Sequence, residues 1–89
     1  MLTLLNPRDR ALSPDLLRRI ADQHERLGRD HREAADAARA DGHHAAARRL
    51  RRSSAYWMTE ATEGRIEADR TEAEAQTRRE WTTLDGECA

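Results

Sequence analysis

Apolar residues recur every three or four positions along two long stretches of the chain, which is the spacing of one helix face. The first stretch follows Ser13-Pro14-Asp15, whose hydroxyl cap, proline and acid are typical of a helix start. It ends at Asp41-Gly42, because glycine readily adopts the left-handed conformation that terminates helices. We therefore expect a helix over residues 13–41. Its expected contact series, with alternating steps of three and four, is Leu17, Ile20, His24, Leu27, His31, Ala34 and Ala38.

A second helix is expected over residues 43–85, where Asp85-Gly86 would end it. Gly64 is the weak point, since a glycine inside a helix costs about 1 kcal/mol relative to alanine. Thr71 and Glu74 have the spacing of a capping box, so a break near Gly64 into a three-helix arrangement is the alternative to the continuous helix that we favour. The expected contact series of this helix is Ala47, Leu50, Ser54, Trp57, Ala61, Gly64 and Ala68.

A turn as short as Asp41-Gly42 makes the two helices antiparallel neighbours. We therefore predict an all-α fold, an antiparallel and coiled-coil-like helical hairpin forming one domain. Residues 1–12 would be a lead-in segment and residues 86–89 a tail. Folding the chain about Gly42 places Leu27 opposite Trp57, Ala34 opposite Leu50, and Ile20 opposite Gly64.

The second helix is longer than the first, so part of it should extend beyond the hairpin. Its apolar side chains would need a cover, either the N-terminal leucines of the same chain or a second chain. Because a two-helix core is thin for a chain of this size, we expect a homodimer. The expected oligomer or partner surface consists of Leu2, Leu4, Leu5, Ile66, Trp81 and Leu84.

Composition supports helices over a sheet. Ala, Glu, Leu and Arg supply more than half of the 89 residues, and there is no valine or phenylalanine. The large apolar residues number only 16, which leaves partial disorder until binding as an alternative. The net charge of -1 and opposite charges four residues apart, such as Glu25 and Arg29, favour the folded helices.

Several classes of protein are not expected. No stretch has the length and hydropathy of a membrane span, and no signal peptide is recognisable, so we expect a cytoplasmic protein without a membrane association. The single cysteine, Cys88, excludes an internal disulfide. The thin core leaves little room for a pocket, so we expect no enzyme, no catalytic residue and no cofactor.

Charge is distributed unevenly along the chain. Residues 1–52 carry twelve arginines and eight acids, whereas residues 53–89 carry four arginines and nine acids. The run Arg48-Arg49-Leu50-Arg51-Arg52 is the densest basic cluster, and it indicates either a solvated or protein-docking face or an anion or nucleic-acid contact. The sequence pI of about 6.4 favours the first interpretation.

Histidines give a weak metal signal. His24 and His31 lie seven apart on the expected contact face, where polar side chains commonly set register; a metal or pH-sensing role is the alternative. His43-His44 is expected in the turn. Neither pair accompanies a recognised metal spacing, so no metal site is predicted.

The sequence therefore predicts a small non-enzymatic helical module for protein–protein interaction, such as an adaptor, an assembly protein or an inhibitory or regulatory protein that self-associates. The alternative is a nucleic-acid-binding regulator that uses Arg48, Arg49, Arg51 and Arg52. The residues expected to hold the hairpin together are Leu17, Ile20, Leu27, Leu50 and Trp57.

Overall fold

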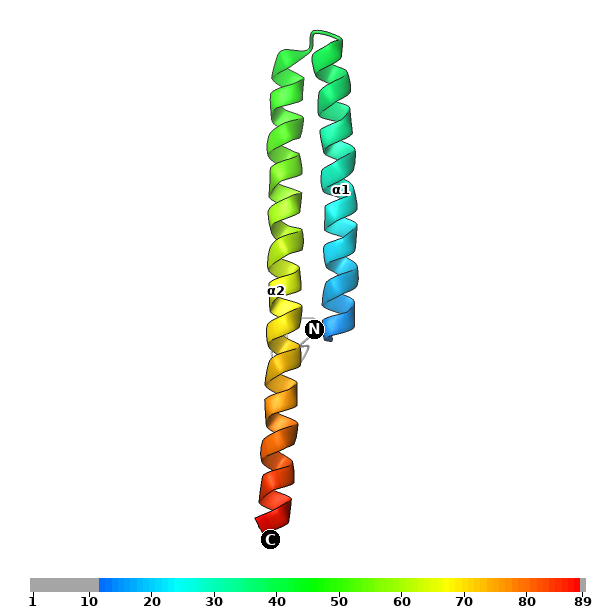
Figure 1. Cartoon of the computed structure of the whole chain (residues 1–89). Coiled ribbons are helices and arrows are strands. Elements are labelled where there is room, and N and C mark those ends of the chain that lie inside the picture. Colours follow the sequence, from blue (N-terminus) through cyan, green and yellow to red (C-terminus); the bar gives the residue numbers. More distant parts are fainter. Residues whose placement is uncertain (1–11, 89) are drawn as a thin grey trace, which may run out of the picture.

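Two antiparallel helices joined by a short turn make up the described structure (Figure 1). The computed structural model describes residues 12–88, with side chains to residue 83. Helix α1 spans Pro14–Ala40 and helix α2 spans His44–Cys88. No strand occurs in this part of the chain, so the predicted all-α hairpin is confirmed. The expected lead-in at residues 1–12 lies almost wholly outside the described residues.

Local signals in the sequence explain where α1 begins and ends. The Ser13 hydroxyl accepts a hydrogen bond of 3.2 Å from the backbone N–H of Leu16, and Pro14 occupies the first turn. At the other end Gly42 has a φ of 84°, a backbone angle that residues other than glycine rarely adopt. The His43 N–H then donates to the Ala38 carbonyl at 2.8 Å and closes the turn. Both predicted boundaries are confirmed to within a residue.

Helix α2 is continuous through Gly64, so the three-helix alternative is wrong. It also passes through Asp85-Gly86 and ends at Cys88, beyond the predicted end. Glycine ends a helix where its backbone adopts the left-handed conformation. Gly86 instead continues the helix, so it does not end α2. With 45 residues against 27, α2 extends well past the start of α1, as Figure 1 shows.

The contact between the helices is made of small residues repeated every seven positions. We call these residues the small-residue seam, and no large side chain is fully buried in the described part of the chain. Small residues at a seven-residue period allow two helix backbones to approach closely. A Cβ built on Gly64 would lie only 3.4 Å from the Ala21 Cβ. The seam consists of Ala21, Gly28 and Ala35 from α1 with Ala47, Ser54, Ala61 and Ala68 from α2.

The predicted contact series holds for α2 but only in part for α1. In α2 the buried residues are members of the predicted series, and Leu50, Trp57 and Gly64 are half-buried between them. In α1 the buried positions lie one residue after the predicted Ile20, Leu27 and Ala34.

Ala34 is exposed and so is not buried in the contact as predicted, and a Cβ on Gly64 would lie nearest to Ala21, the residue after the predicted Ile20. The helices pack through the faces that carry their smallest residues, because these let the backbones come closest. The largest side chains of α1 therefore lie at the side of the contact and not at its centre.

Candidate interaction surfaces

One side of the hairpin is closed by ion pairs between the helices. Arg18 of α1 lies 3.0 Å from Asp69 and 3.1 Å from Glu72 of α2. Arg65 of α2 lies 2.9 Å from both Asp22 and Glu25 of α1. We call this side the ion-pair flank, and its members are Arg18, Asp22, Glu25, Asp36, Arg51, Arg65, Asp69 and Glu72.

The ion pairs favour the charged form of the two central arginines. Hydrogen bonds to Glu72 and then Asp69 raise the pKa of the Arg18 guanidinium above its ordinary value. The hydrogen bond to Asp22, and that to Glu25, likewise raise the pKa of Arg65. The pairs join specific residues of the two helices and so favour one register. Because these groups face solvent, the pairs add only modestly to stability.

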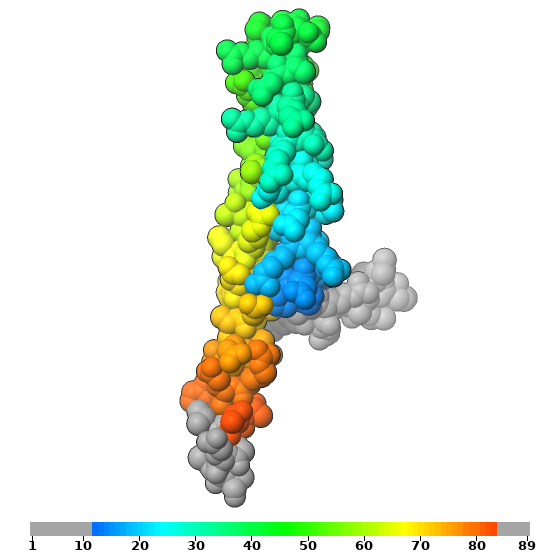
Figure 2. Space-filling model, turned by 45° about the vertical axis from the view of Figure 1, so that its right-hand side comes forward, coloured from blue at the N-terminus to red at the C-terminus, as the bar shows by residue number. Residues whose placement is uncertain are grey.

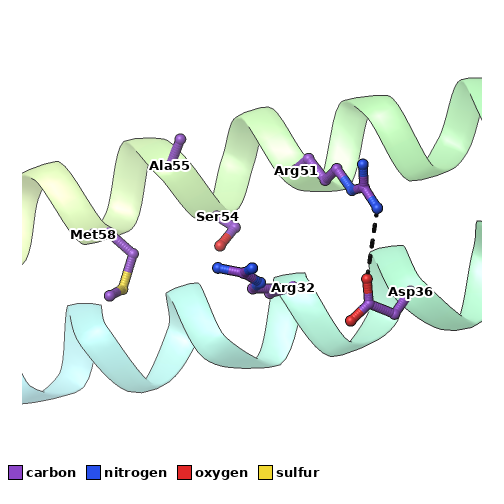
Figure 3. A pocket seen from close by; sticks show the side chains of 6 residues that line it. All are labelled: Arg32, Asp36, Arg51, Ser54, Ala55 and Met58. Atoms are coloured by element: carbon purple, nitrogen blue, oxygen red, sulfur yellow. Dashed lines mark ion pairs between the residues drawn. The ribbon is translucent and has the colours of Figure 1, made fainter.

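A depression lined by both charged and apolar residues lies on the same flank, near the turn (Figure 3). Arg51 lies 3.7 Å from Asp36 across its mouth, and Met58 extends from α2 towards α1. The buried Ser54 hydroxyl donates a 2.7 Å hydrogen bond to the Gly28 carbonyl. That hydroxyl is therefore bonded to a main-chain acceptor and not to a titratable side chain that could activate it as a nucleophile.

The opposite side of the hairpin carries the largest apolar side chains of α1. Successive residues turn by about 100° around a helix, so Ile20 lies about 200° from Asp22, and Leu27 lies about 200° from Glu25. These leucine and isoleucine side chains are only half-buried, and Leu16 is 40% exposed. We call this surface the apolar flank, and it consists of Leu16, Ile20 and Leu27 of α1 with Trp57 of α2.

His24 occupies the centre of the apolar flank. Its ring centroid lies 5.0 Å from that of Trp57, and the two rings are inclined by 39°. Two adjoining surface depressions share His24, one reaching Ile20 and Gly64 and the other reaching Leu27 and Trp57. The flank is therefore a continuous shallow surface along both helices, large enough in length to receive another helix.

The far end of α2 has no cross-helix contact with α1 beyond Glu72 among the described interactions. Figure 2 shows this orange end continuing past the blue start of α1. Trp81 is 63% exposed there, whereas Ile66, which is 58% exposed, lies alongside α1 and lines the same depression as Ile20. Of the other predicted partner residues, Leu2, Leu4 and Leu5 lie outside the described residues, and the side chain of Leu84 is not described.

The predicted basic cluster is exposed on one half of the surface of α2. Arg48, Arg49 and Arg52 are all solvent-exposed on α2, and Arg51 is held near Asp36. At about 100° per residue, the four arginines lie within an arc of about 160°, in the order Arg51, Arg48, Arg52 and Arg49. The cluster therefore places positive charge on one half of the surface of α2 near the turn.

Among residues 12–83, no three His, Cys, Asp or Glu side chains come together as a metal site. His31 lies beside the seam, and its Nδ1 is buried without a hydrogen-bond partner in that part of the chain. His43 and His44 are exposed at the turn and the start of α2. Neither described helix is both long and apolar enough to cross a membrane.

Sequence reasoning missed the part that Gly28 plays. A Cβ on this residue would lie 3.3 Å from the Ser54 carbonyl oxygen and 2.8 Å from the Met58 sulfur. The signal was the recurrence of small residues every seven positions in both stretches, which large apolar residues at neighbouring positions obscured. A comparison with known proteins finds no matching family model, curated protein or solved structure.

Proposed function

We propose that this chain is a small, non-enzymatic, cytoplasmic helical module that acts by protein–protein contact and associates with itself through the apolar flank. The observation that carries the proposal is the exclusion of Ile20, Leu27 and Trp57 from the centre of the contact between the helices. A seam of alanine, glycine and serine buries little apolar area, so the hairpin gains stability when a second surface covers the flank.

A regulatory or assembly role fits such a module, because a partner with a matching apolar helix would compete for the same flank. Competition would couple the self-associated state to the presence of the partner. Of the expected partner residues, Ile66 extends the apolar flank, and Trp81 adds a second region of exposed apolar area at the far end of α2.

Molar mass at micromolar concentration tests the proposal. Light scattering or sedimentation equilibrium should give about twice the 10.2 kDa of the chain. Ile20→Ser should shift the mass to that of the monomer, whereas Met58→Ser, which removes an exposed apolar side chain from the ion-pair flank, should not. Circular dichroism on both variants establishes that the helices are retained. A monomeric wild-type chain, or equal effects of the two variants, would overturn the proposal.

The second candidate function is nucleic-acid binding, which the exposed arginines around the turn end support. Residues 29–52 carry seven arginines and four acids. Binding to random duplex and single-stranded DNA at low and moderate salt tests it, since phosphate contacts weaken steeply as salt rises. Binding that is lost in Arg48→Ala with Arg52→Ala would support this function, and no binding at low salt would eliminate it.

A further inference from the structure

The ion pairs of the ion-pair flank follow a seven-residue spacing along α2, with one interruption. Glu72, Arg65 and Arg51 each lie within ion-pair distance of an opposite charge of α1. Between Arg65 and Arg51, seven residues from each, the chain carries Met58. An apolar side chain therefore stands where the repeat would place an acid of α2.

Arg32 is the charge of α1 that faces this interruption. It lies seven residues after Glu25, which pairs with α2, and it lines the same depression as Met58. Among the described residues, the one ion pair across the depression joins Arg51 to Asp36, and no ion pair reaches Arg32 (Figure 3). The depression is thus lined by two guanidinium groups and one carboxylate, and its net charge is positive.

The remaining lining of the depression is mostly apolar. Met58 and Ala55 lie beside the charged groups, and the Ser54 hydroxyl is already bonded to the Gly28 carbonyl. Methionine adapts to apolar groups of different shape, and the planar guanidinium of arginine can hold a carboxylate with two parallel hydrogen bonds. The volume of about 590 Å³ has room for a carboxylate and an apolar side chain next to it.

We propose that this depression docks an acidic segment of a protein partner, in which a carboxylate pairs with Arg32 and an adjacent apolar side chain packs on Met58. The depression lies on the ion-pair flank, across the hairpin from the apolar flank, so the inference goes beyond the proposed self-association and does not depend on it. A nucleic-acid strand matches the site less well. Its phosphodiester offers no apolar group to Met58 and Ala55, and the lining residues include no aromatic ring on which a base could stack.

Titration with short blocked peptides tests the site. The probe is acetyl-Gly-Glu-Leu-Gly-amide, followed by the NMR chemical shifts of the isotope-labelled full chain. The side-chain N–H of Arg32 and the backbone amides of residues 51–58 should shift in a saturable way. Two control peptides, one with glutamine in place of glutamate and one with glycine in place of leucine, should each bind several-fold more weakly.

Variants of the depression separate a specific site from general attraction to a basic surface. Arg32→Gln should weaken binding of the probe several-fold. Arg49→Gln removes the same charge at the far edge of the arginine cluster from Arg51 and should leave the affinity unchanged. Asp36→Asn should strengthen binding, because it removes the acid that competes for Arg51. Met58→Glu places an acid of the chain itself opposite Arg32 and should abolish binding of the probe.

Circular dichroism establishes that each variant keeps its helices, and the outcomes then decide. Equal weakening by Arg32→Gln and Arg49→Gln would mean that the probe follows overall charge, and would overturn the proposal. Weaker binding to Asp36→Asn, undiminished binding to Met58→Glu, or a wild-type chain that does not respond to the probe would also overturn it. A single-stranded oligothymidylate that binds at Arg32 more tightly than the peptide would assign the depression to phosphodiesters instead.

Discussion

The hydroxyl of Ser54 donates a 2.7 Å hydrogen bond across the seam to the main-chain carbonyl of Gly28. A side chain that reaches the backbone of the facing helix requires a close approach of the two axes, and Gly28 permits that approach because it has no side chain. Ser54 is 8% exposed, so its polar group is buried and satisfied. The pair therefore ties register and helix spacing together at the middle of the seam.

Substitutions at Ser54 should be limited by volume and not by hydrophobicity. Ser54→Ala loses the hydrogen bond but fits the seam, so we expect a loss of about 0.5–1.5 kcal/mol in the free energy of unfolding. Ser54→Val is more apolar but overfills the contact, and we expect it to cost about 1–3 kcal/mol. Urea denaturation followed by circular dichroism measures both. If Ser54→Val were the more stable variant, the close packing at this level would be refuted.

The two glycines inside the helices should respond differently to alanine. At Gly64 the new Cβ would meet the Ala21 Cβ at 3.4 Å, an ordinary contact, so Gly64→Ala should gain up to about 1 kcal/mol from helix propensity. At Gly28 the Cβ would lie 3.3 Å from the Ser54 carbonyl oxygen, which cannot move without the backbone.

Gly28→Ala should therefore be at least about 1 kcal/mol less stable than Gly64→Ala, although both gain the same propensity. Thermal denaturation of the two variants and the wild type gives the comparison directly. Equal stabilisation by both changes would show that the helices are farther apart at Gly28 than the structure places them.

Tyr56 offers a titration that reports on one surface contact. Its hydroxyl donates to Glu60 at 3.2 Å, and this hydrogen bond with the nearby negative charge raises the pKa of the phenol above 10.0. Because the raised pKa belongs to the folded state, the contact stabilises the fold below about pH 10 and is lost as the pH rises through the folded-state pKa.

Tyr56 is the only tyrosine, so the ultraviolet absorbance of its phenolate can be followed without interference from another tyrosine. Glu60→Gln should lower the pKa of Tyr56 towards 10.0. Glu63→Gln removes a weaker and more distant charge and should lower it less, which makes it the matched control. An equal shift in the two variants would show that the hydrogen bond to Glu60 is not formed in solution.

The sequence predicted the hairpin, its turn and the longer second helix because capping residues and glycine act locally. It predicted the contact series of α2, where Ala47, Ser54 and Ala61 alternate with larger residues. In α1 the rule that large apolar residues are buried competed with the rule that small residues permit close packing. Ile20 and Ala21 differ by one position, and only the structure of the pair shows that the smaller one faces α2.

For the same reason, the sequence did not reveal the apolar flank. Ile20 and Leu27 were assigned to the inside of the hairpin, so the surface that they form with Trp57 on its side could not be anticipated. The extension of α2 past α1 was predicted correctly, since it follows from helix lengths alone, but Ile66, which was expected on that extension, lies beside α1 near Ile20.

Trp57 should contribute to stability in a concentration-dependent way. Removing a fully buried tryptophan costs about 3–5 kcal/mol, and since Trp57 is half-buried we expect Trp57→Ala to cost roughly half of that in the monomer. If a second copy covers the flank, the difference from wild type should grow as protein concentration rises, because the wild type gains more from association. Denaturation at low and high micromolar concentration tests this. A difference that does not change with concentration would place Trp57 outside the interface.

A substitution at Trp81 distinguishes the contribution of the end of α2 to self-association from that of the apolar flank. Trp81 is 63% exposed on the part of α2 that extends past α1, so Trp81→Ala should leave the unfolding free energy of the monomer within about 0.5 kcal/mol of wild type. If the end of α2 contributes to self-association, the dissociation constant should rise by roughly tenfold, the equivalent of about 1.4 kcal/mol. Sedimentation equilibrium on Trp81→Ala and Ile20→Ser in parallel compares the two surfaces. A dissociation constant unchanged by Trp81→Ala but raised by Ile20→Ser would assign the interface to the flank alone and remove Trp81 from the predicted partner surface.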